Sequence, residues 1–112
     1  MKFIDLKKEN CPVDYALVLV EMEIESAIRE GEVVIKVLHG YGSHGRGGAI
    51  LVALRQMLST YKKQKRIVDY FGGDRWNIFD KETLEILNKD KTIYNDEDMG
   101  KANPGITIIV LK

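Results

Sequence analysis

The residues best suited to chemistry lie in one short stretch, 39–48, which reads HGYGSHGRGG. It holds both histidines of the chain, one arginine and five glycines. Glycines let backbone N–H groups approach an anion closely, and a helix that begins after such a loop adds favourable partial charge. An apolar run precedes the stretch and a helical pattern follows it. These residue types favour a loop that binds a phosphate-like anion. The alternative is a tight turn with no ligand, in which glycine serves only the backbone geometry.

The GxGxxG pattern of residues 40–45 is typical of dinucleotide-binding proteins, and Asp69 lies farther along as a candidate ribose-binding acid. That fingerprint belongs to the first strand–helix turn of its fold, whereas a complete strand–helix unit precedes it here. The same residues approach a P-loop, but Arg46 and Gly47 stand where that motif requires Lys and then Ser or Thr. A small nucleotide-binding protein is therefore the weaker alternative.

Hydrophobic periodicity predicts the elements that position this loop. Apolar β-branched runs predict strands, and apolar residues at three- and four-residue spacing predict helices. The expected strands are 3–6, 33–38, 66–71 and 106–111, and the expected helices are 13–28, 50–61 and a shorter one at 81–88. The glycine loop then follows the carboxyl end of the second strand, where open α/β sheets bind ligands.

The order of these elements predicts an α/β fold in which two helices cover a single-layer, small mixed sheet. Along the chain the order is βαβα, then β, an insertion and a last β. We expect residues 1–112 to form one domain, because the chain is too short for two ordinary ones. The segment at about 74–103 is expected to be an insertion, because it is long for a connection in a compact domain.

Side chains in this insertion have structural and functional interpretations. Trp76, Phe79 and Tyr94 are expected to pack onto the body of the protein rather than to stack on unpaired bases. The acidic run 96–98 is expected to be a solvated turn rather than a cation site. Cys11 stands alone and no Cys/His cluster has zinc spacing, so the sequence predicts no metal site.

Three short motifs give the chain a resemblance to a known family. The sequence VLHGYGS resembles the HGxG motif of the small MutS-related, or Smr, domain through His39, Gly40 and Gly42. Upstream, residues 4–7, IDLK, fall where the family has its LDxH motif. Residues 104–111, PGITIIVL, resemble the glycine-led strand that closes the domain. The resemblance covers the chain on both sides of the insertion.

This resemblance implies a βαβαββ-type fold, nucleic-acid binding and, as in many members, endonuclease activity on DNA or RNA. It implies that Asp5, the acid of the first motif, and His39, the histidine of the second, are the catalytic residues. The glycines would shape the backbone beside the phosphate. This resemblance and the anion-binding chemistry of the glycine loop together give the expected phosphate-binding residues: Lys7, Gly40, Gly42, Ser43, His44, Gly45 and Arg46.

Lys7 departs from the family pattern, because LDxH has a histidine at this position. Histidine suits acid–base chemistry since its pKa lies near neutrality, whereas a charged lysine grips phosphate or stabilises developing charge. A non-catalytic nucleic-acid-binding module is therefore the alternative to an endonuclease, unless His44 replaces the missing histidine. The sequence leaves open the choice of DNA or RNA and the use of Mg²⁺.

Composition limits the partners and the location. The chain has 17 basic and 17 acidic residues, so its net charge gives no overall attraction to nucleic acid. Residues 61–66, YKKQKR, fit a solvated helix end and part of a polyanion-binding surface equally well. No apolar run approaches the roughly 20 residues of a membrane span, and no signal-peptide pattern begins the chain. We expect a cytoplasmic monomer with no membrane partner.

Overall fold

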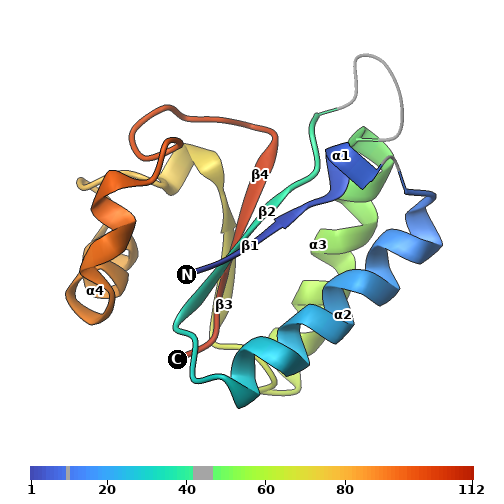
Figure 1. The fold of residues 1–112 in the computed structure, drawn as a ribbon, viewed down its shortest axis with the longest axis horizontal. Helices are drawn as coiled ribbons and strands as arrows, with labels where there is room; N and C mark the ends of the chain where they lie inside the picture. The colour runs from blue at the N-terminus through green and yellow to red at the C-terminus, as the bar shows by residue number, and fades with distance from the viewer. Residues whose placement is uncertain (10, 42–46) are drawn as a thin grey trace.

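The computed structural model describes residues 1–9, 11–41 and 47–112 and contains a four-stranded mixed sheet (Figure 1). Its strands are β1 (Lys2–Asp5), β2 (Val34–Leu38), β3 (Asp69–Gly72) and β4 (Ile106–Val110), in the spatial order β1-β2-β4-β3. β1 pairs with β2 in parallel, and β4 lies antiparallel between β2 and β3. The predicted α/β class with a small mixed sheet is confirmed.

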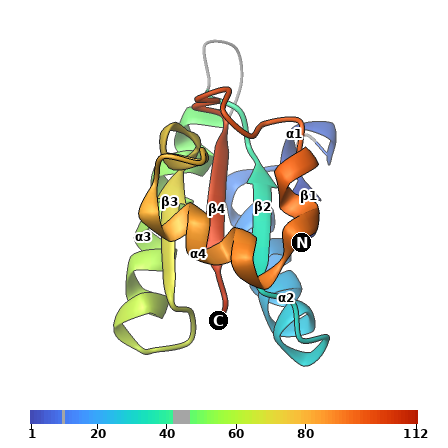
Figure 2. The same ribbon diagram turned by 90° about the vertical axis from the view of Figure 1, so that its left-hand side faces the viewer.

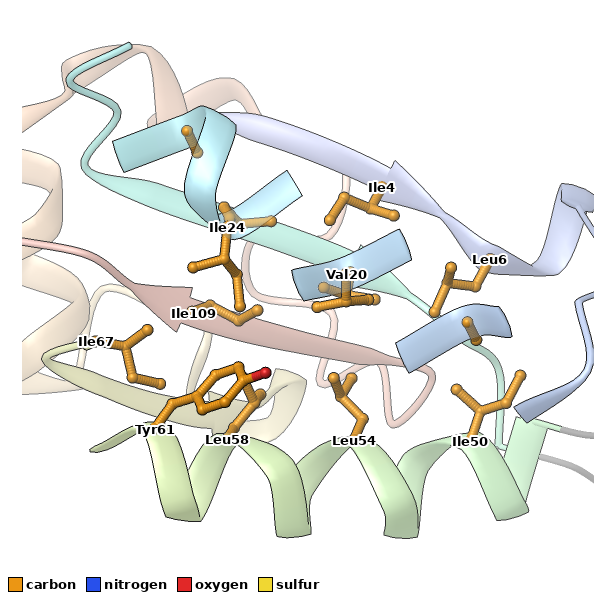
Figure 3. Close-up of a cluster of buried hydrophobic side chains, with 14 of the residues drawn as sticks. Ile4, Leu6, Val20, Ile24, Ile50, Leu54, Leu58, Tyr61, Ile67 and Ile109 are labelled. Carbon is orange, nitrogen blue, oxygen red and sulfur yellow. The ribbon is translucent and has the colours of Figure 1, made fainter. Parts of the chain in front are cut away.

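Two long helices cover one face of the sheet. The single turn α1 (Leu6–Glu9) continues β1, and α2 (Val13–Arg29) and α3 (Gly47–Lys63) follow it. Their predicted apolar stripes meet alternate side chains of the strands in a first core cluster (Figure 3). Its fully buried members include Val20, Ile24, Leu54, Leu58 and Ile109. Burial of each such side chain contributes about 1.5–3 kcal/mol, which fixes both helices against the sheet.

Most boundaries lie within two residues of the prediction, and the starts of α3 and β3 differ from it more, for local reasons. α3 begins at Gly47 rather than at Ile50, although each glycine costs a helix about 1 kcal/mol relative to alanine. Burial of Ile50 and the residues that follow it holds this first turn in place. β3 begins at Asp69 rather than at Arg66, because Lys65 takes a left-handed φ of 61° and the chain turns there.

The segment expected to be an insertion covers the other face of the sheet (Figure 2). It contains the short 3-10 helices η1 (Gly73–Arg75) and η2 (Lys91–Asn95) and the helix α4 (Lys81–Lys89) between them. Buried side chains of this segment and of the sheet form a second core cluster, made of Val34, Phe71, Trp76, Ile86, Ile93, Ile106, Ile108 and Val110. The sheet is thus covered on both faces. The assignment of the whole chain to one domain stays a prediction.

The three aromatic residues of this segment have different environments. Trp76 is fully buried, contacts the ring of Phe71 at a centroid distance of 6.3 Å, and donates from Nε1 to Asp96 Oδ2 at 2.9 Å. Its predicted packing role is confirmed. Phe79 is 91% exposed and Tyr94 is 61% exposed, so the packing predicted for these two is wrong.

The acidic run 96–98 also differs from its prediction as a solvated turn. The ammonium group of Lys36, 3% exposed in the middle of β2, lies 2.7 Å from Asp96 Oδ1 and 2.7 Å from Asp98 Oδ2. Burial alone would lower the pKa of Lys36, but the hydrogen bonds and charges of the two aspartates more than reverse this and raise it. The two carboxylates therefore fasten the segment to the sheet.

Among the described residues, no helix combines the length and the apolar character needed to cross a bilayer.

Candidate functional site

Three strands end where the fourth begins, at one edge of the sheet. β1, β2 and β3 run in one direction and β4 runs in the other, which brings three groups of residues together. They are Asp5–Lys8, His39–Tyr41 and Gly72–Asp74, with residues 105–107 from the start of β4. We call this edge the strand-end edge. α3 begins beside it, at the top of Figure 1.

The side chain of His39 is buried at this edge, with 1% of its surface exposed. Its Nδ1 bonds to the carbonyl oxygen of Gly40, which can only accept, so Nδ1 carries the proton. Its Nε2 then accepts from the hydroxyl of Thr107 at 2.8 Å. Both ring nitrogens are therefore occupied, and the imidazole connects β2 to β4.

The environment of His39 favours its neutral form. Burial lowers the pKa of His39, the hydrogen bond to the Gly40 carbonyl opposes this, and the charge of Arg55 lowers the pKa further. A neutral imidazole with both nitrogens bonded orients its neighbours. To act as general acid or base it would first have to leave Thr107.

Gly40 brings the backbone of the HGxG motif next to Lys7. Its φ of +78° lies in the left-handed region that favours glycine, and its N–H donates to Gly105 O at 3.0 Å. A Cβ placed on Gly40 would lie 3.3 Å from Cδ of Lys7, so the lysine stem lies directly over this peptide. A Cβ on Gly105 would lie 3.2 Å from Gly40 Cα. Gly40 is thus favoured by its left-handed φ, and a side chain at Gly105 would crowd the backbone of Gly40.

Asp5 has a visible structural role at the same edge. Its Oδ1 accepts from the backbone N–H of Lys8 at 2.9 Å, which caps the short helix α1. The cap occupies one carboxylate oxygen of Asp5, and the side chain is half-buried. The catalytic role of Asp5 stays a prediction.

Thr107 and Arg55 belong to this site and were missed by the sequence interpretation. Thr107 is fully buried, and its Oγ1 accepts from Nη2 of Arg55, on α3, at 3.4 Å. One signal was available for Thr107, since it is a polar residue within the apolar run ITIIVL. The sequence holds no such signal for Arg55, because a charged residue next to Leu54 is ordinary in an amphipathic helix.

Five predicted phosphate-binding residues, Gly42, Ser43, His44, Gly45 and Arg46, lie outside the described residues. The chain resumes at Gly47, where α3 begins with no acidic residue in its first turn. The first N–H groups of this 17-residue helix have no partner within the helix, and this end carries partial positive charge. The N-terminal end of α3 therefore suits an anion.

The basic stretch 61–66 lies at the opposite end of α3 from the strand-end edge. Part of its charge is compensated: Lys62 pairs with Asp69 at 2.9 Å, and Arg66 lies 3.4 Å from Glu21 and stacks on the ring of Tyr61. The sequence left open whether this stretch belongs to the same binding face as the glycine loop. Its place at the far end of α3 does not support that interpretation.

No group of three metal-ligating side chains occurs within the part of the chain that the structure describes. The described residues of the strand-end edge include two aspartates, Asp5 in β1 and Asp74 in η1, and they do not form a cluster that defines a Mg²⁺ site. The use of Mg²⁺ stays open.

No protein-family model and no curated protein matches the chain. Among solved structures, it is similar to the crystal structure of the Smr domain of Thermus thermophilus MutS2. The two chains share 22% sequence identity, and the match covers 100% of this chain and 99% of the other with a TM-score of 0.61. The chain therefore has the Smr-domain fold, as its motifs predicted.

Proposed function

We propose that this protein binds the phosphate backbone of nucleic acid at the strand-end edge. The observation that carries the proposal is the position of Lys7, whose stem lies over the left-handed peptide of Gly40. Lys7 is exposed and forms no ion pair with a described side chain. Its ammonium group and the N-terminal end of α3 are the positive groups that a phosphate would contact together.

Binding without cleavage fits the geometry better than an endonuclease. His39, the predicted acid or base, is buried and neutral, with both ring nitrogens engaged. Lys7, in place of the first-motif histidine, is a phosphate-binding group rather than a base. Cleavage is the second candidate, since Asp5 lies on the same edge and His44 falls in the adjoining loop.

A gel assay separates these functions. End-labelled single-stranded and double-stranded DNA and RNA are incubated with the protein at low salt, with and without Mg²⁺. We expect shifted but intact substrate. Product that disappears in His39→Ala and increases in Lys7→His would instead establish an endonuclease. Neither shift nor product would contradict nucleic-acid binding altogether.

The nucleotide-binding alternative makes a separate prediction. A protein that used the GxGxxG pattern would be stabilised against heat by NAD or a mononucleotide, because a ligand that binds only the folded state raises Tm. We expect no such rise.

A further inference from the structure

Arg55 is a partly buried cation that has few partners among residues 1–9, 11–41 and 47–112. Its Nε is buried and has no hydrogen-bond partner among the described residues. Within the same residues its one hydrogen bond is the long one, 3.4 Å, from Nη2 to Thr107 Oγ1. A guanidinium has five N–H donors in a rigid fork that matches phosphate geometry. The described residues use little of this capacity, and none of their carboxylates forms an ion pair with Arg55.

The fold places this guanidinium at the strand-end edge. Side chains on a helix lean toward its N-terminus, so Arg55 reaches from the third turn of α3 toward the end at which this helix begins. It passes over Gly72, the last residue of β3. A Cβ on Gly72 would lie 2.7 Å from Nη2, so the side chain occupies space that only glycine leaves open.

Arg55 and Lys7 lie on opposite sides of His39 along this edge. Lys7 lies over Gly40 at the end of β2, and Arg55 lies over Gly72 at the end of β3. Since β4 separates these two strands, their ends are about 10 Å apart. A chain of hydrogen bonds joins the two places: Arg55 donates to Thr107, Thr107 to His39, and His39 to the carbonyl of Gly40.

Asp74 is the acidic side chain nearest to this position. Its Oδ1 would lie 2.8 Å from a Cβ on Gly72, a point that is also 2.7 Å from Arg55 Nη2. The two side chains form no ion pair. Asp74 therefore weakens the attraction of Arg55 for an anion without neutralising it.

We propose that Arg55 binds a second phosphate group of the nucleic acid, on the β3 side of the strand-end edge. The edge would then hold two phosphates of one strand, one over Gly40 and one at Arg55. The identity of the ligand as nucleic acid rests on the proposed function, whereas binding of an anion by Arg55 does not.

Inorganic phosphate tests Arg55 by itself. In a His44→Gln variant His39 is the remaining histidine, and its ring can be titrated by NMR with and without phosphate. We expect phosphate to raise the pKa of His39, because it neutralises the charge of Arg55. In Arg55→Gln the pKa should already be higher, and phosphate should raise it less than in the protein that keeps Arg55, because only the phosphate over Gly40 remains. No phosphate effect, or an equal effect in both proteins, would overturn the proposal.

Oligonucleotide affinity provides the second measurement. We expect Arg55→Gln to weaken binding of a short oligonucleotide about tenfold, the size of one lost charged hydrogen bond. Arg29→Gln is the matched control, because it removes the same charge from the exposed C-terminal end of α2. Binding by Arg55→Gln equal to that of the control would overturn the proposal.

Gly72→Ala tests the position of the guanidinium without changing charge. Its new Cβ would displace Nη2, so we expect a loss of affinity similar to that of Arg55→Gln and an unchanged denaturation midpoint. Full affinity in this variant would contradict the placement. If phosphate shifts His39 but no oligonucleotide binds the wild type, the Arg55 site stands and the proposed function fails. If the wild type binds the oligonucleotide but phosphate does not change the pKa of His39, the proposed function stands and the phosphate site at Arg55 is overturned.

Discussion

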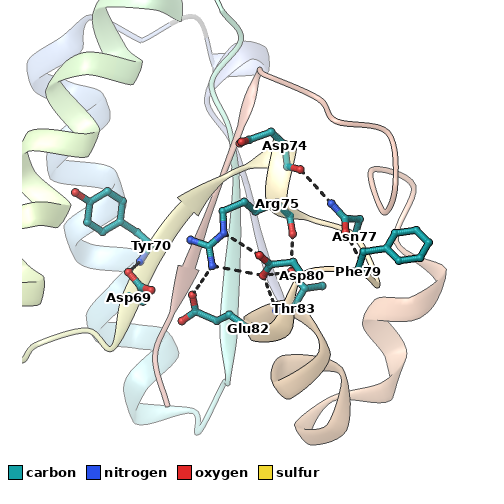
Figure 4. A network of polar contacts seen from close by, with 9 residues as sticks. All are labelled: Asp69, Tyr70, Asp74, Arg75, Asn77, Phe79, Asp80, Glu82 and Thr83. Atoms are coloured by element: carbon teal, nitrogen blue, oxygen red, sulfur yellow. Dashed lines mark hydrogen bonds and ion pairs between the residues drawn. The ribbon is translucent and has the colours of Figure 1, made fainter.

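The cations on the two sides of the molecule are used differently. On the face covered by the 73–105 segment, Lys36 is held by two aspartates, and Arg75 lies 2.9 Å from Asp80 and 3.1 Å from Glu82 (Figure 4). At the strand-end edge, Lys7, Lys8 and Arg55 form no ion pair with a described side chain.

This difference separates charges that build the fold from charges that are available to a ligand. A paired, buried cation fastens two elements, and its removal exposes the carboxylates it neutralised. A cation that forms no ion pair contributes little to folding, and its charge is available to attract an anion. We therefore expect changes on the covered face to alter stability, and changes at the edge to alter binding.

The largest effect on stability is expected from Lys36→Met. It would leave Asp96 and Asp98 buried without a counter-charge, at a cost of about 3–5 kcal/mol in the free energy of unfolding. Denaturant unfolding measures this cost. The triple variant in which both aspartates also become Asn should recover much of it, and a single variant as stable as wild type would show that the pair does not fasten the segment.

His39→Ala is expected to lower the free energy of unfolding by about 2–4 kcal/mol, because it creates a cavity and leaves Thr107 and the Gly40 carbonyl without their partner. Tyr41→Ala, next in the motif but 62% exposed, serves as the control and should change stability little. Equal stability of the two variants would contradict the connecting role of His39.

The acidic pair on the covered face gives a smaller, pH-dependent effect. Burial and the neighbouring Asp69 carboxylate raise the pKa of Glu82 to about 7, above its value in an unfolded chain. Between these values the folded state binds more protons, so the contribution of Glu82 to stability is present at low pH and is lost as pH rises through 7.

The difference in the free energy of unfolding between wild type and Glu82→Gln isolates the contribution of Glu82. The contribution of His39, which changes with pH in the opposite direction, is the same in both proteins and cancels. Since the pKa of His39 is lowered, its contribution is present above the ordinary value of 6.5 and is lost as pH falls from there through the lowered pKa. We expect the difference to decrease by on the order of 1 kcal/mol between about pH 5 and pH 8, once solvent screening is included. A constant difference would mean that Asp69 and Glu82 do not share a proton.

The smallest effect is expected at the far end of α3. Lys63→Gln removes an exposed charge of the basic stretch 61–66, away from the strand-end edge. Oligonucleotide affinity and its dependence on salt should stay as in wild type. A loss as large as that of an edge variant would extend the binding surface to this end of the helix.

Most of the fold was predictable because apolar periodicity reports which side of an element faces the core. The stripes of α2 and α3 and the runs of β2 and β4 carry this signal directly. The cover formed by residues 73–105 was not predictable in the same way. Its attachment depends on the ion pairs of Lys36 with Asp96 and Asp98. In the sequence, Lys36 is a polar residue within an apolar strand, and the two aspartates belong to a run that predicted a solvated turn.

The candidate site was predictable only where it is continuous in sequence. His39 and Gly40 form part of a motif, and the strand before them fixes where they lie. Arg55, Thr107 and Gly72 come together through strand order, since β4 enters between β2 and β3. The burial of His39 against Thr107 depends on that same order, which the sequence interpretation did not specify.

The most direct test of nucleic-acid binding at the strand-end edge is the salt dependence of affinity for a single-stranded oligonucleotide, compared between wild type and Lys7→Gln. Each lost phosphate contact lowers the slope of log affinity against log salt by about 1. We predict this decrease for Lys7→Gln, with an unchanged denaturation midpoint because Lys7 is exposed. Equal slopes for the two proteins would show that the phosphate is not held over Gly40 and would contradict the proposal.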